Sequence, residues 1–342
     1  MGRPETCLVT GGGGFLGKAI VKQLRRRGHA VVSFSRGDYP ELAAMGAAHM
    51  TGDLCDRAAV ENACQGVDVV FHTAAKAGVW GAYDGYFRTN VIGTDHIIDA
   101  CRKHRVSRLI YTSSASVIYN GKNMAGNDES LPYPRRHLSR YAKTKALAEQ
   151  RIIAASDEHL RTLVLRPHLI WGPEDSQLVP RIIERANRLA VVGQGNNIAD
   201  TIYIDNAAEA HVLAADKLLD NPGLSGRVYF ISQDDRVPVW EMINRILAAA
   251  GRPPVRRRVP AFAAWIIGGL MEMIYAAARI DREPPMTRFV ARELSTSHWY
   301  DISAAKRDLG FFPRISTKEG LNRLRDWLQD TSVTGPPAVP SG

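Results

Sequence analysis

Tyr141 and Lys145 lie four residues apart in Tyr-Ala-Lys-Thr-Lys, inside a stretch whose pattern predicts a helix over residues 141–156. Residues at i and i+4 share one helix face, so a phenol and an ammonium project from the same surface. A free tyrosine has a pKa of about 10, and a neighbouring cation lowers it by favouring the phenolate. The pair therefore predicts proton exchange with a substrate oxygen. Taken alone, an exposed helix with an unrelated Tyr and Lys is the alternative.

A glycine-rich turn, Thr10-Gly-Gly-Gly-Gly-Phe-Leu-Gly, separates a predicted strand over residues 7–10 from a predicted helix over 15–27. A pyrophosphate needs close backbone approach, which a Cβ would block, and it gains from the N–H groups at a helix N-terminus. The turn predicts a dinucleotide site, with a purely structural glycine turn as the alternative. The contacts expected here are Gly11, Gly13, Gly14, Phe15, Leu16 and Gly17.

The second predicted strand, over residues 30–34, is followed by Ser35 and Arg36, with no acid at the position that usually binds the ribose hydroxyls of NAD. A serine can donate to a 2′-phosphate and an arginine can pair with it. We therefore expect NADP, with NAD as the alternative because an arginine can also stack on adenine. Further cofactor contacts are expected after later strands, at Asp53, Leu54, Ala74, Ala75, Lys76 and Thr112.

Ser113 and Ser114 follow a predicted strand over residues 109–112, at the edge where open α/β sheets bind ligands. A hydroxyl there can donate to a carbonyl oxygen and stabilise developing negative charge. Serines at strand ends also form ordinary turns. Combined with the glycine turn and the Tyr141–Lys145 pair, these serines predict a substrate site.

The elements that position these residues alternate along the chain, which is typical of a parallel sheet covered on both faces. We predict a Rossmann-type, doubly wound α/β domain over 1–170, with returns near 201–232. A smaller, mainly helical substrate lobe is expected over 171–200 and 235–330, followed by a disordered tail over 331–342. Other strands are expected at 47–50, 67–72, 162–166 and 228–231, and other helices at 58–65, 86–104 and 205–219. The helices at 86–104 and 141–156 are long enough to pair in a homodimer.

The composition predicts a soluble globular protein, with 45% hydrophobic and 23% charged residues and a net charge of +9. The basic residues form no stripe with interleaved aromatics, which argues against nucleic-acid binding. Four cysteines without metal or redox spacing predict reduced thiols in the cytoplasm, and no metal site is expected. Residues 261–278 are nearly all apolar; we expect a helix that caps a hydrophobic substrate pocket, with peripheral membrane docking second and a membrane span third.

Over nearly its whole length the chain resembles the extended short-chain dehydrogenase/reductase superfamily. The glycine turn, Asp53-Leu54, the serines after residue 112 and Tyr-x-x-x-Lys match in order. Ala75-Lys-Ala-Gly-Val-Trp-Gly and Leu165-Arg-Pro-His-Leu-Ile-Trp-Gly-Pro resemble the 3β-hydroxysteroid dehydrogenase branch. Arg36-Gly-Asp-Tyr-Pro-Glu-Leu and His298-Trp-Tyr are similar to bacterial 2-alkyl-3-oxoalkanoate reductases, and sterol-4α-carboxylate 3-dehydrogenases share much of the pattern.

The resemblance implies that Tyr141 is the general acid/base, that Lys145 lowers its pKa and holds the nicotinamide ribose, and that Ser114 polarises the substrate oxygen. Ser113 is the alternative for this last role. The implied reaction reduces a 2-alkyl-3-oxoalkanoate with NADP, with 3β-hydroxysteroid or sterol-4α-carboxylate oxidation as the rival and an NADP-sensing regulator as the non-enzymatic alternative. The remaining expected contacts are Pro167 and His168 beside the nicotinamide, and Trp80 and Trp171 in the substrate pocket.

Overall fold

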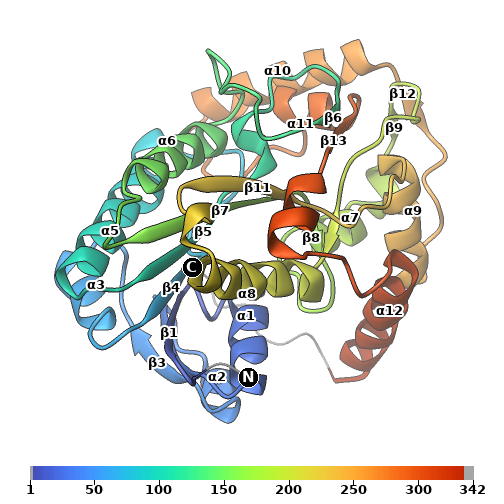
Figure 1. The fold of residues 1–342 in the computed structure, drawn as a ribbon. Helices are drawn as coiled ribbons and strands as arrows, with labels where there is room; N and C mark the ends of the chain where they lie inside the picture. Colours follow the sequence, from blue (N-terminus) through green and yellow to red (C-terminus); the bar gives the residue numbers. More distant parts are fainter. Residues whose placement is uncertain (1–2, 335–342) are drawn as a thin grey trace.

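The sheet predicted from the alternating pattern is present in the computed structural model, which describes residues 3–334. Its seven strands are all parallel and lie in the order β11-β7-β5-β4-β1-β2-β3, with helices on both faces (Figure 1). The strands are β1 (Thr6–Thr10), β2 (Ala30–Ser35), β3 (Ala48–Thr51), β4 (Val69–His72), β5 (Arg108–Thr112), β7 (Arg161–Pro167) and β11 (Arg227–Ile231). The strand predicted at 228–231 does return to this sheet, beside β7.

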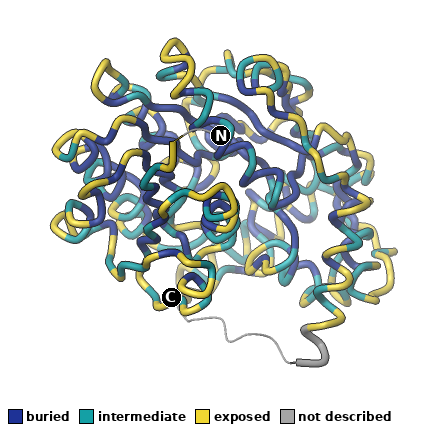
Figure 2. Tube along the Cα trace, turned by 60° about the horizontal axis from the view of Figure 1, so that its bottom comes forward, coloured by how far each residue is buried: buried dark blue, intermediate teal, exposed yellow. Residues whose placement is uncertain are grey.

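The core has two layers because successive strand residues point to opposite faces. In β1, Cys7 and Val9 pack with one buried cluster while Leu8 packs with the other. Helices α1 (Phe15–Arg26), α2 (Pro40–Ala44) and α8 (Ile204–Asp220) contribute to the first cluster, and α3 (Arg57–Ala63), α5 (Gly93–Lys103) and α6 (Arg140–Ala154) to the second. Buried segments accordingly run through the middle of the molecule (Figure 2).

The helix predicted at 86–104 is more complex than its sequence indicates. It comprises α4 (Tyr83–Phe87), a π-helical turn at Arg88–Ile92 and then α5. A π-helical turn inserts an extra residue into the helix, and such turns are frequent at functional sites. Here the turn carries Asn90.

The smaller lobe is mainly helical, as predicted, but it also contains short parallel strands whose pairing sequence analysis did not predict. In particular, β13 (His298–Tyr300) pairs with β6 (Met124–Asn127) from a distant part of the chain. The other pairs are β8 (Ile170–Trp171) with β10 (Ile202–Tyr203), and β9 (Val191–Val192) with β12 (Arg258–Val259). The helices are α7 (Leu178–Glu184), α9 (Val239–Ala249), α10 (Ala261–Ala277), α11 (Arg288–Glu293) and α12 (Thr317–Thr334).

The structure bears on two further predictions for this lobe, the tail from residue 331 and the apolar helix near residues 261–278. Helix α12 continues to Thr334, so the predicted disordered tail does not begin at residue 331; residues 335–342 of that prediction lie outside the described part. Helix α10 forms where the apolar stretch predicted one. No helix within residues 3–334 has the length and hydropathy needed to cross a bilayer.

Candidate active site

Helix α6 places Tyr141 and Lys145 on one face at its N-terminal end. Ser139 is the N-cap, and its hydroxyl accepts a hydrogen bond from the Ala142 N–H at 3.1 Å. Serine is among the preferred N-cap residues because it satisfies an otherwise unpaired N–H group. The helix therefore begins immediately before Tyr141, which is half-buried, and one turn later Lys145 is 2% exposed.

The phenol of Tyr141 carries its proton at neutral pH. Burial raises the pKa of Tyr141 to about 12, although the hydroxyl of Ser114 acts in the opposite direction. A group with this pKa carries its proton throughout the neutral range and can donate it to a substrate oxygen. The expected lowering of this pKa by Lys145 stays a prediction.

The ammonium of Lys145 contacts the end of β5. Its Nζ donates a hydrogen bond to the Thr112 carbonyl at 2.6 Å and lies 4.1 Å from the centre of the Tyr111 ring. Burial lowers the pKa of Lys145 to about 7, while the charge of Glu149 one turn further along α6 opposes this shift. The side chain is thus fixed between β5 and α6, with a pKa that makes its charge responsive to whatever binds beside it.

Of the two serines after β5, Ser114 is the one that reaches Tyr141. Ser114 is half-buried, and its hydroxyl also lies 2.9 Å from that of Ser116. Ser113 is 2% exposed, and its hydroxyl has no hydrogen-bond partner among residues 3–334. Its N–H donates to the Leu165 carbonyl of β7, so Ser113 lies between two strands. This geometry favours Ser114 as the residue that polarises a substrate oxygen.

Asn90 connects α6 to the segment that follows β4. Its Oδ1 accepts a hydrogen bond from the Lys76 N–H at 2.7 Å, and its Nδ2 donates to the Lys76 carbonyl at 3.1 Å and to the Thr144 hydroxyl at 3.1 Å. Ala74 donates its N–H to the Thr10 hydroxyl at 3.2 Å. Hydrogen bonds therefore connect the segment predicted to run beside the cofactor, Ala74, Ala75 and Lys76, to β1 and, through Asn90, to α6.

The glycine turn has the shape that a dinucleotide requires. Gly11 has φ of +69°, in the region that glycine enters without strain, and a Cβ on Gly17 would lie 2.1 Å from the Gly11 carbonyl oxygen. Gly14 caps α1 without a side-chain hydrogen bond. The N–H groups of Phe15 and Leu16 have no acceptor within the described residues. These open donors at a helix N-terminus fit an anionic pyrophosphate.

Replacing Gly17 with Ala should damage this turn selectively. The new Cβ collides with backbone rather than with a movable side chain, so we expect about 1–3 kcal/mol lower free energy of unfolding and weaker NADPH binding. The control is Gly14→Ala, whose Cβ would lie 3.2 Å from the same carbonyl oxygen and should cost much less. Urea unfolding of the ligand-free proteins and fluorescence titration with NADPH measure both effects. Equal stability of the two variants would contradict the expectation.

The end of β2 leaves Arg36 available for a ligand. Arg36 is exposed and has no ion pair or hydrogen bond among the described residues, while the Ser35 hydroxyl accepts the Gly13 N–H at 3.2 Å. Asp53 is exposed and caps the Cys55 N–H at 2.8 Å, whereas Leu54 is 5% exposed and packs against Gly93. Arg36 is thus an unpaired cation beside the cofactor turn.

His168, immediately after β7, belongs to a hydrogen-bonded pair that sequence analysis did not predict. Its Nε2 lies 2.6 Å from Nδ1 of His298 on β13, and Nε2 of His298 lies 2.8 Å from the Glu293 carbonyl. A carbonyl only accepts, so His298 donates from Nε2 and must accept the Nε2–H of His168 at Nδ1. Burial lowers the pKa of both imidazoles, which keeps them neutral. His298-Trp-Tyr stood out in the sequence as a motif, but its partner was not evident.

Behind Tyr141 and Lys145, α6 is fixed to β7 by a buried ion pair. Glu149 is fully buried and Arg166 is 3% exposed; their side chains make hydrogen bonds of 2.5, 3.1 and 3.2 Å. The Tyr133 hydroxyl donates to the same carboxylate at 2.6 Å. Sequence analysis missed this network; its signal was Glu149 four residues after Lys145 and Arg166 directly before Pro167.

The two tryptophans predicted for the substrate pocket differ in position. Trp171 is fully buried against Tyr203, and its Nε1 donates to the Thr201 hydroxyl at 3.2 Å, so the indole packs in the lobe core and its place in the substrate pocket stays a prediction. Trp80 is partly exposed, and its Nε1 donates to the Ile280 carbonyl at 2.9 Å.

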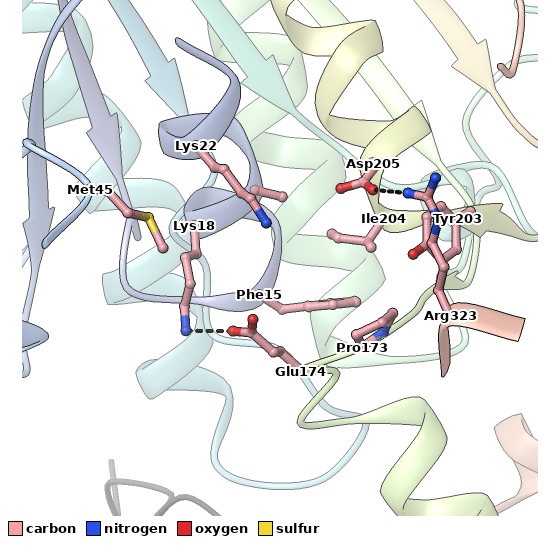
Figure 3. A pocket seen from close by; sticks show the side chains of 11 residues that line it. Phe15, Lys18, Lys22, Met45, Pro173, Glu174, Tyr203, Ile204, Asp205 and Arg323 are labelled. Carbon is pink, nitrogen blue, oxygen red and sulfur yellow. Dashed lines mark hydrogen bonds and ion pairs between the residues drawn. The ribbon is translucent and has the colours of Figure 1, made fainter. Parts of the chain in front are cut away.

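A separate hollow of about 220 Å³ lies between α1, the segment before α7, and α8. Its lining includes Phe15 from the cofactor turn, and ion pairs Lys18–Glu174 and Asp205–Arg323 lie at its sides (Figure 3). Ser114, Tyr141 and Lys145 are absent from its walls. Since its main charges already pair with one another, we do not assign it a part in the chemistry.

Comparison with known proteins identifies the family of this chain. The model of the 3-beta hydroxysteroid dehydrogenase/isomerase family matches residues 8–258. The 2-alkyl-3-oxoalkanoate reductase of Stenotrophomonas maltophilia is 50% identical, over 93% of this chain and 98% of that protein, and that of Shewanella oneidensis is 47% identical, over 93% and 84%. The sterol-4-alpha-carboxylate 3-dehydrogenase, decarboxylating, of Mus musculus is 32% identical, over 94% and 90%.

Solved structures share the fold. The crystal structure of gox2253 superimposes with a TM-score of 0.79 at 24% identity, covering 95% of this chain and 98% of that one. MoeE5 in complex with UDP-glucuronic acid and NAD has a TM-score of 0.73 at 25% identity, covering 95% and 99%. With its glycine turn, its serine after β5 and its Tyr141–Lys145 pair, the chain belongs to the 3-beta hydroxysteroid dehydrogenase/isomerase family of NAD(P)-dependent extended short-chain dehydrogenases/reductases.

Proposed function

We propose that this enzyme uses NADPH to reduce the keto group of a 2-alkyl-3-oxoalkanoate, a β-keto acid with apolar chains. The observation that carries the proposal is the placement of the Tyr141 phenol beside the Ser114 hydroxyl, one helical turn from Lys145 on α6. Ketone reduction needs a proton for the new alkoxide, and a phenol with its pKa raised to about 12 holds one at neutral pH.

Ser114, Tyr141 and Lys145 each have a distinct role in this reaction. When bound, the nicotinamide supplies the hydride. The hydroxyls of Ser114 and Tyr141 donate to the substrate oxygen, which polarises the carbonyl and stabilises the developing negative charge. Tyr141 then gives up its proton to that oxygen. Lys145 supports the charge that remains on Tyr141 and holds the cofactor ribose.

The preference for NADPH over NADH rests on Arg36. A guanidinium without a partner in residues 3–334, at the end of β2, is suited to bidentate pairing with a 2′-phosphate. The Ser35 hydroxyl lies between this arginine and the glycine turn and can add a donor.

Reversing the charge at Arg36 should therefore shift cofactor choice. For Arg36→Glu we expect the KM for NADPH to rise about 10- to 100-fold, as for the loss of a charge-assisted hydrogen bond, with little change for NADH. Arg26→Glu, an exposed arginine in the last turn of α1, is the control for net charge. Initial rates with both cofactors measure the effect. An equal loss with NADPH and NADH would show that Arg36 does not read the phosphate.

The substrate class is inferred from the relatives. Two bacterial 2-alkyl-3-oxoalkanoate reductases are 47–50% identical to this chain, against 32% for the mouse sterol-4-alpha-carboxylate 3-dehydrogenase. Both substrate classes place an oxygen at the carbon next to one that bears a carboxylate. The higher identity favours the acyclic β-keto acid.

A panel of substrates and cofactors tests the proposal. Purified enzyme is assayed by absorbance with 2-alkyl-3-oxoalkanoates and NADPH or NADH, and with 3β-hydroxysterols, with and without a 4α-carboxylate, and NADP or NAD. We expect reduction of the β-keto acids with NADPH to be fastest. Faster oxidation of the sterols would establish the rival assignment. Cofactor binding without turnover on any member would support an NADP-sensing regulator.

Two further expectations belong to this proposal. We expect a homodimer through α5 and α6, whose exposed faces carry Asp99, Arg102 and Gln150. Light scattering measures the oligomer.

The four cysteines are free thiols, three of them buried, which suits the reducing cytoplasm in which we place the enzyme.

A further inference from the structure

Helix α10 exposes an apolar surface that the proposed chemistry does not explain. Of its 17 residues, Ala264 and Gly268 are the buried ones. Large side chains along its outer side are strongly exposed: Phe262 by 70%, Met273 by 63% and Ile274 by 61%. Figure 1 places α10 with α11 at the periphery of the molecule, away from the sheet. A contiguous apolar patch of this kind marks an interaction site rather than ordinary surface.

The middle of α10 is attached to the protein, which opposes an end-on orientation of the helix toward a membrane. A Cβ on Gly268 would lie 2.6 Å from the backbone carbon of Thr287, so the two backbones are in close contact. Glu272, the one acidic residue in α10, accepts hydrogen bonds at 2.7 Å from the N–H and from Nε of Arg288. The charge within the helix is therefore neutralised on the side that faces the protein.

Positive charge flanks both ends of the apolar surface. Arg256, Arg257 and Arg258 precede α10, Arg279 and Arg282 follow it, and all five are exposed. An apolar helix face between clusters of arginine fits the interface of a bilayer with anionic headgroups, where apolar side chains enter the acyl boundary and guanidinium groups pair with phosphates. We propose that α10 docks this enzyme, lying in the membrane plane, on an anionic lipid surface.

A second copy of the chain fits this surface less well. Placing α10 against α10 would bring two basic clusters together, and juxtaposed like charges oppose association. An anionic bilayer satisfies the apolar side chains and the arginines at once. The self-association reading remains as an outcome of the test.

The docking surface adjoins the segment that leads to Tyr141. Beyond the C-terminal end of α10, the Ile280 carbonyl accepts a hydrogen bond from Trp80, whose ring also contacts Tyr275. The residue after Trp80 is Gly81, whose carbonyl accepts a hydrogen bond from Arg140, the neighbour of Tyr141. Docking through α10 would therefore bring the membrane close to the loop over the catalytic helix, where a lipid-like substrate could enter.

Vesicle flotation of the full-length protein tests the proposal, with phosphatidylcholine alone and with phosphatidylcholine plus phosphatidylglycerol. We expect binding to the anionic vesicles, weakened by salt, and at least about tenfold weaker binding for the double variant Phe262→Glu/Met273→Glu. The control double variant, Leu219→Glu/Phe312→Glu, alters side chains that are 50% and 61% exposed elsewhere and should bind like wild type. Circular dichroism verifies the fold of each variant.

Brominated lipids provide a second readout, with a conservative variant that introduces no charge. They should quench wild-type tryptophan fluorescence more than that of Trp265→Phe, because Trp265 on α10 is 40% exposed. Wild-type protein that stays unbound in the presence of anionic vesicles would overturn the proposal. So would a dimer in solution that the α10 double variant dissociates while neither protein floats, since the surface would then be a protein interface.

Discussion

Replacing Tyr141 with Phe should lower kcat for ketone reduction roughly 10²- to 10⁴-fold, the usual contribution of a positioned general acid. The change removes the proton donor and leaves the ring in place at the start of α6. Cofactor affinity should be nearly unchanged because Lys145 and the glycine turn remain. Initial rates and NADPH titration separate the two effects.

Tyr229→Phe is the matched control for this experiment. It removes a tyrosine hydroxyl that donates to Asp308 at 3.1 Å, on β11 and away from α6. We expect the control to retain wild-type kcat. Tyr141→Phe with near wild-type reduction would contradict the assignment of the acid, and an equal loss in both variants would point to a general effect on the fold.

Glu149→Gln should be among the most destabilising single changes in the chain, by about 3–5 kcal/mol, because it leaves the buried guanidinium of Arg166 without its counter-charge. The substitution nearly preserves the size of the side chain, so packing contributes little to the expected loss. Chemical denaturation of the ligand-free protein measures it.

An exposed ion pair provides the control. Glu241 and Arg245 lie 2.6 Å apart on α9 with both side chains at least 40% exposed, and Glu241→Gln should cost no more than about 0.5 kcal/mol. The double variant Glu149→Leu/Arg166→Met should recover much of the loss, since it removes both buried charges. If Glu149→Gln were as stable as Glu241→Gln, the buried pair would not hold α6 to β7.

Elements with strong local signals were predictable from sequence. The alternation of apolar runs with helical patterns located all seven strands of the sheet, and the glycine turn lay at the junction of β1 and α1. Tyr141 and Lys145 were predicted on one helix face because residues four positions apart in a helix lie on the same side.

Features that depend on distant contacts or on hydrogen-bond register were not predictable. The π-helical turn at Arg88–Ile92 is a shift in backbone bonding within an otherwise ordinary helical pattern. The pairing of β13 with β6 joins segments far apart in the chain, and it brings His298 to His168. The burial of Trp171 in the lobe core was not predictable either, because the sequence pattern around an indole does not distinguish a pocket wall from a core.

The electrostatics of the site also had to come from the structure. Spacing alone suggested that Lys145 lowers the pKa of Tyr141, but burial has the larger effect on both groups in the ligand-free protein. Burial favours the neutral form of each side chain, raising one pKa and lowering the other. A free tyrosine is also protonated at neutral pH, so the cofactor and substrate, and not this pKa, set the direction of the reaction.

The most direct test of the account follows the hydride. Enzyme, a 2-alkyl-3-oxoalkanoate and NADPH deuterated at its transferable position are mixed for a single turnover, and the product is analysed by mass spectrometry and NMR. We predict one deuterium on the carbon that carried the keto oxygen, with loss of NADPH absorbance in equal amount. A product without deuterium at that carbon, or unreacted β-keto acid alongside rapid NAD-dependent oxidation of a sterol, would contradict the account.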